Sequence, residues 1–437
     1  MKKFIKYFFI LILFIHYGVL YSQLYVEQNS GVASPLLSVS VNQSISYYGN
    51  AWICGYNGVV LKTTNEGINW INVSGNGIPT SVDLVNIFCF DAGSAITAGY
   101  TSSGTYVYRT SNGGANWHQV FSQPDGFIDA VWMKNSTEGF MYGDPVGNRW
   151  SLWKTSNGGV NWDSSGIYLP PASGTEAGWN NALFMKNNNI WFGTNNHRIY
   201  RSTNFGLTWT YGVTSELSTT AFWFYYADSL YGYYGGSNSY KTTNGGTSWT
   251  ILNCPGTGSF LGFVSGEALS PNFPYQPSIS WTVRGDNRIY QNYFMSDWSI
   301  AYTAPGGNYY HIGTNHNYAL FYTWAVRSNG GITRIVTLFG EVKKISSEVP
   351  NSFSLSQNYP NPFNPKSKIK FQITKLSMVK LIVFDELGKM ITTLVNEQLQ
   401  PGTYEAAWDA SNYSSGVYFY KLITPEFTET RKMILIK

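Results

Sequence analysis

One eight-residue pattern returns along the first 250 residues and constrains the fold more than any other feature. It reads Ser/Thr-x-Asn-x-Gly-x-x-Trp, and the asparagines of its five copies lie 47, 45, 47 and 40 residues apart. A motif that returns at a period of about 40–50 residues, with room for four short strands, is typical of a β-propeller. The motif residues are Asn65, Gly67, Trp70, Asn112, Gly114, Trp117, Asn157, Gly159, Trp162, Asn204, Gly206, Trp209, Asn244, Gly246 and Trp249.

Two weaker copies extend the series. One covers residues 289–292 with Trp298, and the other covers residues 327–331 with Arg334 in the place of the tryptophan. Seven units then average 44 residues from Asn65 to Asn329. We therefore predict an all-β fold with a seven-bladed propeller over residues 24–345.

Each unit divides into short runs that are rich in aromatic and β-branched residues. In the third unit the predicted strands are 127–134, 139–143, 151–155 and 161–164, broken by Gly, Asn and Ser. The motif then joins the third strand to the fourth, with asparagine accepting a backbone hydrogen bond and glycine adopting a left-handed conformation. Residues 37–41 are a candidate for an extra strand that closes the ring. The sequence leaves open how closure happens.

The N-terminus has the pattern of a secretory signal peptide at residues 1–22. Lys2, Lys3 and Lys6 precede an apolar run at 8–15, which is short for a membrane span. We expect no transmembrane segment after signal cleavage. Without those three lysines the chain has 25 basic and 24 acidic residues, so a nucleic-acid partner is not expected.

Cofactor and metal patterns do not stand out in the sequence, and we expect neither. The three cysteines, Cys54, Cys89 and Cys254, allow at most one disulfide, and we favour three thiols packed as small apolar groups. No CxxC pair, HExxH or glycine-rich phosphate loop is present.

The repeat stops near residue 345, and a second domain is predicted at 352–437 after a linker at 346–351. Strand-like runs lie at 369–373, 379–385, 390–396, 403–408, 417–424 and 428–436. So many short strands in fewer than 90 residues predict an immunoglobulin-like β-sandwich.

This tail resembles the C-terminal sorting domain of type IX secretion cargo from the Bacteroidetes. The residues that carry the resemblance include Asn358, Pro360, Asn361, Pro362, Phe363, Gly402, Tyr404, Gly416, Tyr418, Lys432 and Lys437. The resemblance implies that the type IX secretion machinery is a partner of the tail. It also implies export across both membranes, removal of the tail, and release from the cell or attachment to its outer surface.

The repeated turn resembles the Asp-box of sialidases and related secreted propellers, with asparagine in place of aspartate. That resemblance implies that the turns lie away from any active centre. Residues 241–249 also resemble the unit of photosystem II assembly-factor-like propellers. That family implies a binding role toward partner proteins and no catalysis.

Candidate site residues lie in the connections expected on the face opposite the repeated turns. A glycoside hydrolase needs two carboxyl groups about 6.5–9.5 Å apart across the sugar for inversion. Asp125, Asp144 and Asp286 are the weak catalytic candidates. Three arginines from different units could hold a carboxylate. The ligand-binding candidates are Arg149, Trp179, His197, Arg198 and Arg288.

The sequence favours a secreted or cell-surface binding module for a protein or a glycan over an enzyme. A glycoside hydrolase of the Asp-box propeller type is the first alternative, and a structural surface protein is the second. Converging acids at the channel mouth would favour the hydrolase. An exposed aromatic platform would favour a glycan binder.

Overall fold

The computed structural model describes most of the chain, which divides into two compact units, Leu24–Thr337 and Leu338–Lys437. The described residues are 22–42, 49–224, 231–266, 279–293, 295–315, 322–338, 342–388, 390–411 and 413–437. Apart from Ser22, the predicted signal peptide lies outside them. All regular elements within them are strands, and none is a helix that could cross a membrane.

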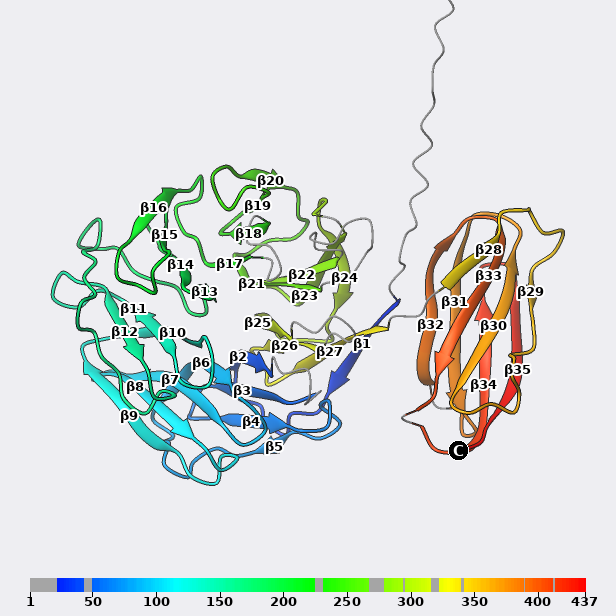
Figure 1. Ribbon diagram of the computed structural model, residues 1–437, viewed down its shortest axis with the longest axis horizontal. Coiled ribbons are helices and arrows are strands. Elements are labelled where there is room, and N and C mark those ends of the chain that lie inside the picture. Colours follow the sequence, from blue (N-terminus) through cyan, green and yellow to red (C-terminus); the bar gives the residue numbers. More distant parts are fainter. Residues whose placement is uncertain are drawn as a thin grey trace, which may run out of the picture. The chain divides into compact units, whose positions relative to one another are not determined.

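The first unit is a ring of seven antiparallel sheets, with one strand of each sheet facing the centre (Figure 1). This arrangement confirms the predicted propeller. Blade 1 holds β2 (Leu36–Val41), β3 (Ala51–Gly55), β4 (Val60–Thr63) and β5 (Ile71–Asn72). Blade 2 holds β6 (Asp83–Cys89), β7 (Ala95–Thr101), β8 (Gly104–Thr110) and β9 (His118–Pro124). Blade 3 holds β10 (Ile128–Met133), β11 (Gly139–Gly143) and β12 (Ser151–Thr155).

The remaining blades continue the same order from the inner to the outer strand. Blade 4 holds β13 (Leu183–Lys186), β14 (Asn189–Gly193), β15 (Arg198–Ser202) and β16 (Thr210–Val213). Blade 5 holds β17 (Ala221–Phe224), β18 (Gly232–Gly235), β19 (Ser239–Thr242) and β20 (Thr250–Leu252). Blade 6 holds β21 (Phe260–Gly266), β22 (Ile279–Arg284), β23 (Arg288–Tyr293) and β24 (Ser299–Thr303). Blade 7 holds β25 (Tyr309–Thr314), β26 (Tyr322–Arg327), β27 (Ile332–Leu338) and β1 (Ser22–Gln28).

The ring closes because β1, from the N-terminal end, is the outer strand of blade 7. Residues 37–41, the candidate for this role, instead belong to β2, the inner strand of blade 1. Gln28 at the end of β1 accepts hydrogen bonds from the indoles of Trp70 (3.0 Å) and Trp324 (2.9 Å). One glutamine therefore ties the first blade to the last.

Closure also explains why the seventh copy of the motif is weak. Residues 327–331 join β26 to β27, the second and third strands of the blade, and not the third and fourth as the repeat predicts. The fourth strand comes from the other end of the chain, so no tight turn has to lead into it. In the sixth copy residues 289–292 lie within the third strand, β23, and Trp298 directly precedes the fourth, β24.

The five strong motifs form one turn with the same hydrogen bonds. In blade 1 the Asn65 carboxamide oxygen accepts the Asn69 N–H (3.0 Å), and the Thr63 hydroxyl accepts the Gly67 N–H (2.8 Å). The equivalent asparagine bonds recur in blades 2 to 5 at 2.9–3.0 Å. The motif glycines are left-handed, with φ between 75° and 85°. The predicted turn geometry is therefore what the structure contains.

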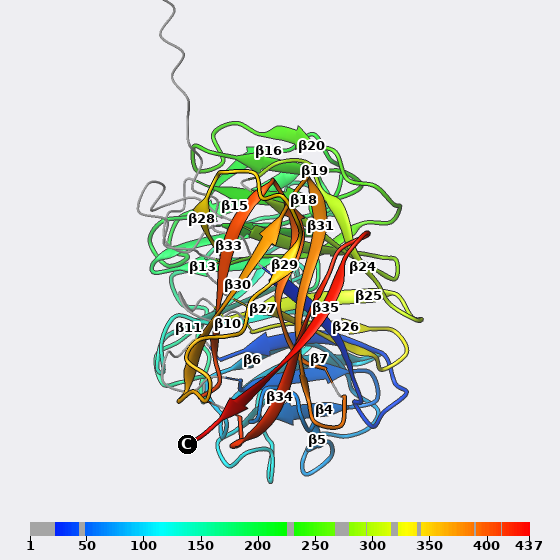
Figure 2. The ribbon, with the colours of Figure 1, turned by 90° about the vertical axis from the view of Figure 1, so that its right-hand side faces the viewer.

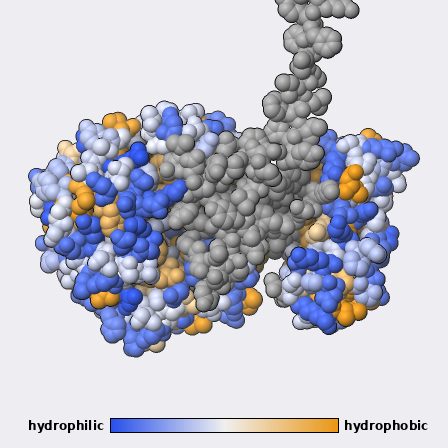
Figure 3. All heavy atoms as spheres, in the orientation of Figure 1, coloured by the Kyte–Doolittle hydropathy of each residue, from blue (hydrophilic) through white to orange (hydrophobic). Residues whose placement is uncertain are grey.

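The hydrophobic core of the propeller lies between neighbouring blades. Tyr142 of blade 3 stacks on Phe192 of blade 4 with ring centroids 4.8 Å apart, and Trp150 packs against the same ring at 4.9 Å. Such aromatic pairs add to the stabilisation from burial. On the face shown in Figure 3, the coloured hydrophobic residues of the ring are scattered among hydrophilic ones.

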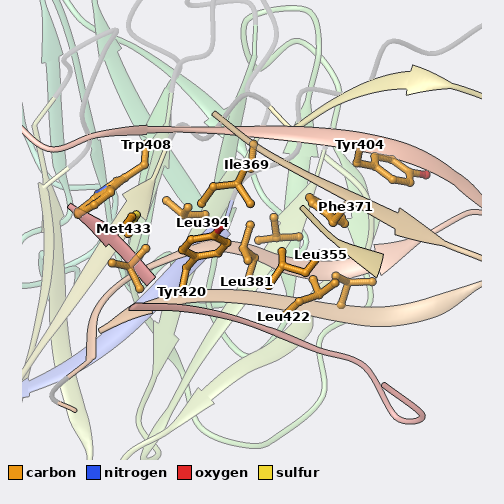
Figure 4. Packing of buried hydrophobic residues seen from close by; sticks show 14 of the residues in the cluster. Leu355, Ile369, Phe371, Leu381, Leu394, Tyr404, Trp408, Tyr420, Leu422 and Met433 are labelled. Carbon is orange, nitrogen blue, oxygen red and sulfur yellow. The ribbon is translucent and has the colours of Figure 1, made fainter. Parts of the chain in front are cut away.

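The second unit is a sandwich of two four-stranded sheets (Figure 2). One sheet has the order β28 (Val342–Ser346), β33 (Gly402–Asp409), β30 (Lys366–Ile373), β29 (Ser354–Leu355). The other has the order β32 (Met390–Leu399), β31 (Ser377–Asp385), β34 (Gly416–Ile423), β35 (Thr428–Leu435). Alternate residues of both sheets point inward and form one core, with Leu381, Tyr420 and Met433 near its middle (Figure 4).

The boundary between the units lies earlier than the predicted end of the propeller at residue 345. Strand β28 pairs with β33 from Val342 to Ser346, so residues assigned to the propeller and to the start of the linker at 346–351 belong to the sandwich. The sequence did not distinguish this strand from those of the propeller, because the propeller units are also built of short strands of similar composition.

The sorting-motif residues tie the entry segment of the sandwich to its last strand. Phe363 is buried, donates its N–H to Ile434 (3.0 Å) and accepts the Ile436 N–H (3.0 Å). The Asn361 carboxamide accepts the Ile434 N–H (2.9 Å), and Asn358 donates to Pro360 and Ser367. Residues 358–363 therefore cover the outer edge of β35.

Candidate functional site

The candidate residues lie on the face of the ring that we call the loop face. It is formed by the connection between the second and third strands of each blade and by the connection to the next blade. In an antiparallel meander these connections lie at the end of the strands opposite the Asn-Gly-Trp turns. In blades 3 and 4 the loop face comprises residues 144–150, 168–182, 194–197 and 214–220.

Two of the predicted residues, Asp144 and Trp179, belong to connections that contact each other on the loop face at blade 3. Asp144 follows β11, and its carboxylate accepts the Gly178 N–H at 2.7 Å. The Tyr142 hydroxyl donates to the Trp179 carbonyl (2.6 Å) and accepts the Trp179 N–H (3.3 Å). Side chains of blade 3 thus hold the main chain of this connection at consecutive residues.

A second carboxyl group, Asp129, lies beside Asp144 and was missed by the sequence reasoning. Asp129 is the extra residue of a β-bulge at the start of β10, and only 2% of its surface is exposed. Its Oδ2 has no hydrogen-bond partner among the described residues. Asp129 falls within an apolar strand, where a lone aspartate gives no sign that a bulge turns it toward the loop face.

Burial raises the pKa of both carboxyl groups. For Asp129, burial raises the pKa well above its usual range, and the charge of Asp144 adds to the effect. For Asp144, burial raises the pKa while the Gly178 N–H lowers it. Gly178 covers the pair closely, since a Cβ there would lie 2.3 Å from Asp129 Oδ2. Gly178 therefore shields the Asp129 carboxyl group from solvent.

Blade 4 supports the same connection from its other side. The Glu176 carboxylate accepts the Ala172 N–H (2.5 Å) and the Tyr200 hydroxyl (3.1 Å). Asn195 accepts the Ala177 N–H through its side chain (2.9 Å) and donates its own N–H to the Ala177 carbonyl (3.1 Å). The segment 172–179 is thus held by two blades.

Apolar side chains are exposed along this part of the loop face. Trp179 is 38% exposed and Leu217 is 60% exposed. His197, another predicted ligand-binding residue, lies between their segments, is exposed, and donates its backbone N–H to Leu217 (2.8 Å). An exposed aromatic side chain on a segment with a firmly held main chain is the arrangement that a binding surface requires.

The three predicted arginines each interact locally, in three different blades. Arg149 donates to the carbonyls of Ser164 (3.0 Å) and Ile167 (2.6 Å). The guanidinium of Arg198 lies over the Tyr211 ring at 4.0 Å. Arg288 begins β23 in blade 6. A shared carboxylate clamp thus has no support in these contacts.

The other two catalytic candidates also have local surroundings. Asp125 is an exposed residue with a left-handed backbone between blades 2 and 3. Asp286 in blade 6 accepts the Tyr290 hydroxyl (2.5 Å) and the Arg288 N–H (3.0 Å). Asp144, by contrast, lies beside the second carboxyl group of Asp129, and its charge raises the pKa of Asp129.

The inner strands enclose a small cavity of about 100 Å³ at the centre of the ring. His311 on β25 lines it, and its Nδ1 accepts the Val39 N–H at 3.2 Å. Burial lowers the pKa of His311 to about 4, so the imidazole of this residue is neutral at pH 7. Asn181 also lines the cavity and accepts hydrogen bonds from Ser38 and Asn86, both at 2.8 Å.

Neither the cysteines nor the acids form a metal site within the described ranges. No group of three or more His, Cys, Asp or Glu side chains there could hold an ion. Cys54 and Cys89 are buried free thiols, and burial raises the pKa of both above the usual range. Cys254 is a free thiol that is partly buried, and burial raises its pKa to about 12.

The fold and the tail together define a class: an exported β-propeller protein. Residues 357–437 match the family model described as the secretion system C-terminal sorting domain. The match confirms the prediction made from the tail, and the protein is cargo of the type IX system, secreted or placed at the cell surface.

Solved structures with the same propeller fold include two of YCF48. YCF48 from Cyanidioschyzon merolae is 16% identical with a TM-score of 0.56, and the match covers 71% of this chain and 98% of that one. YCF48 bound to D1 peptide is 14% identical with a TM-score of 0.55, covering 72% and 97%. A comparison with curated proteins finds no match. At this identity the likeness shows the fold alone.

Proposed function

We propose that this exported propeller is a binding module that takes a protein ligand on the loop face at Trp179. The observation that carries the proposal is the exposed indole of Trp179 on a main chain held at both its N–H and its C=O by Tyr142. An aromatic anchor that is already ordered loses little entropy on binding, and such residues dominate the energy of interfaces.

The YCF48 structure with a D1 peptide supports a protein ligand, because it is a propeller of this fold with a peptide bound. A glycan is the other ligand class in keeping with the site. A flat exposed indole stacks on the apolar face of a sugar ring as readily as it packs on an apolar side chain. The same surface therefore has to be tested with both.

Glycoside hydrolysis is the second candidate function, favoured by the pair Asp129 and Asp144. Such enzymes use two carboxyl groups, of which the general acid has a raised pKa while the other stays ionised. Asp129, however, is 2% exposed and lies beneath Gly178, so a sugar on the loop face has access to Asp144 alone. Binding therefore accounts for the geometry better than cleavage.

A photo-crosslinking experiment tests the binding proposal on the full chain. A benzophenone amino acid is placed at Trp179, and at Tyr168 as the control, since Tyr168 is an exposed aromatic on the same connection. We expect a discrete covalent adduct with a surface protein from position 179 and none from 168. Equal labelling from both positions, or none, would overturn a protein site at Trp179.

A parallel incubation with soluble and insoluble polysaccharides separates the other functions. Depletion of the chain from solution that is lost in Trp179→Ala would replace the protein ligand with a glycan. Release of reducing ends that is lost in Asp144→Asn would establish a hydrolase. A chain that gives no adduct, no depletion and no release is the structural surface protein.

A further inference from the structure

Blade 3 lacks a regular fourth strand, although the sequence predicts one at residues 161–164. Only one bridge forms, in which Lys154 and Asp163 exchange two backbone hydrogen bonds of 2.8 Å. Four residues before Lys154, Trp150 donates its N–H to the carbonyl of Leu169 (2.9 Å). Between these two points the chain turns away from β12, where Ile167 donates to Ser164 (3.2 Å).

The gap leaves the centre of the β12 edge open. In an antiparallel sheet every second residue directs its N–H and C=O to the same neighbour. The backbone N–H groups of Trp150 and Lys154 point away from β11, toward the outer edge of the blade. Leu152 lies midway between them, so its N–H and C=O point to the same edge. Within the described residues Leu152 has no backbone partner on that side. Blade 4 fills the equivalent edge with four residues of β16.

A cavity of about 190 Å³ lies along this open edge. Four buried polar atoms in its lining side chains have no hydrogen-bond partner among the described residues: Trp150 Nε1, Ser151 Oγ, Trp153 Nε1 and Gln123 Oε1. Ser151 itself is only 4% exposed. A buried donor or acceptor without a partner is unfavourable, so several such groups around one opening indicate a ligand that pairs with them.

The cavity is also positively charged. Arg149 lines it, and the two hydrogen bonds of its guanidinium go to backbone carbonyls, those of Ser164 and Ile167. No carboxylate within the described ranges forms a salt bridge with Arg149. The indole N–H and hydroxyl groups nearby are donors as well, so the site is complementary to an acidic group.

We propose that the open edge of β12 takes an extended peptide segment of a partner protein that carries an acidic side chain, and that this segment completes blade 3. Its backbone pairs with the N–H and C=O of Leu152, as in recognition by strand addition. Its carboxylate accepts hydrogen bonds from Ser151 and Trp153 beside Arg149. This site is formed by β12, by Arg149 and Trp150 just before it, and by Gln123 of β9. It does not include Trp179, so it goes beyond the function proposed for that residue.

A synthetic peptide tests the proposal on the full chain. The probe is acetyl-Thr-Val-Thr-Glu-Thr-Val-Thr-amide, and affinity is measured by calorimetry. We expect at least a tenfold loss of affinity when lysine replaces the glutamate, and a similar loss when the glutamate nitrogen is methylated. On the unmodified protein, the peptide should slow amide hydrogen exchange at residues 150–155 and leave the third strand of blade 4, residues 198–202, unchanged.

Two variants assign the contacts. Arg149→Met should abolish the preference for glutamate over lysine, whereas Arg201→Met, which removes a charge from the third strand of a complete blade, should keep it. Since Arg149 also holds two carbonyls, Ser151→Ala is the milder variant, with a severalfold loss expected. No binding at millimolar peptide, equal binding of the lysine peptide, or unchanged exchange at 150–155 would each overturn the proposal.

Discussion

Arg334 of blade 7 donates to Glu66 of blade 1 at 2.8 Å, so a turn of the first repeat is joined by charge to the last blade. Tyr322 adds its hydroxyl to the same carboxylate at 2.8 Å. Glu66 belongs to the motif copy that is first in the sequence, and Arg334 stands where the weak seventh copy lacks its tryptophan. The residue that breaks the repeat therefore takes part in closing the ring.

Replacing Arg334 with methionine should destabilise the propeller by about 1–2 kcal/mol, because Glu66 loses its charged partner while remaining partly buried and keeps only the Tyr322 hydroxyl. The apolar stem still covers Tyr322 and Trp324. Arg201→Met is the matched control, since the Arg201 guanidinium lies over the ring of Trp191, which belongs to the same blade. Thermal unfolding followed by tryptophan fluorescence should show a lower Tm for Arg334→Met only. Equal shifts would mean that the charge contributes nothing to closure.

In the repeated turn, the side-chain oxygen of the asparagine should contribute more to the stability of the propeller than its side-chain nitrogen. Asn112→Ala removes the acceptor of the Asn116 N–H and of the Thr110 hydroxyl, both at 3.0 Å, and should cost about 1 kcal/mol. Asn112→Asp retains the acceptor, and the Tm should stay close to that of the original chain. Denaturation at pH 7 compares the two. A loss in the aspartate variant as large as in the alanine variant would contradict this role.

The central histidine should make the propeller acid-sensitive. The folded pKa of His311 is lowered to about 4 from 6.5, so the unfolded chain binds more protons between those values. Stability is therefore full above pH 6.5 and falls as pH drops toward 4, by no more than about 3 kcal/mol. His311→Gln should flatten the dependence of Tm on pH across this window. His118→Gln, at an exposed position, should leave the dependence unchanged.

Asp129 should have the opposite dependence. Its folded pKa is raised above the unfolded value of 3.8, so the native state binds more protons and stability falls as pH rises above 3.8. Asp129→Asn removes the ionisation in a side chain of nearly the same size. The Tm difference between variant and original chain should grow in favour of the variant from pH 4 to pH 8. A difference that is constant with pH would show that Asp129 does not titrate in this way.

Much of the fold could be predicted from the sequence because it depends on patterns of residues that are close along the chain. The Thr-x-Asn-x-Gly turn is specified by side-chain to backbone bonds within five residues, so its geometry follows from residue type. The six strand runs of the tail agree with β30 to β35 for the same reason, since alternation along a strand is local. The site was less accessible. Asp144 and Trp179 were predicted, but Asp129 was hidden inside an apolar strand.

Local patterns along the chain specify the propeller units, the turn that five of them share, and the sorting tail, since each depends on residues that are close in sequence. How the ring closes, where the fourth strand of blade 3 is missing, and which acid lies beside Asp144 follow from the three-dimensional packing. These features depend on contacts between distant residues: β1 meets β27 across about 300 residues, and Leu152 is open because the chain at 164–168 turns away. Distant pairing is chosen by the packing of whole blades, and no local pattern encodes it.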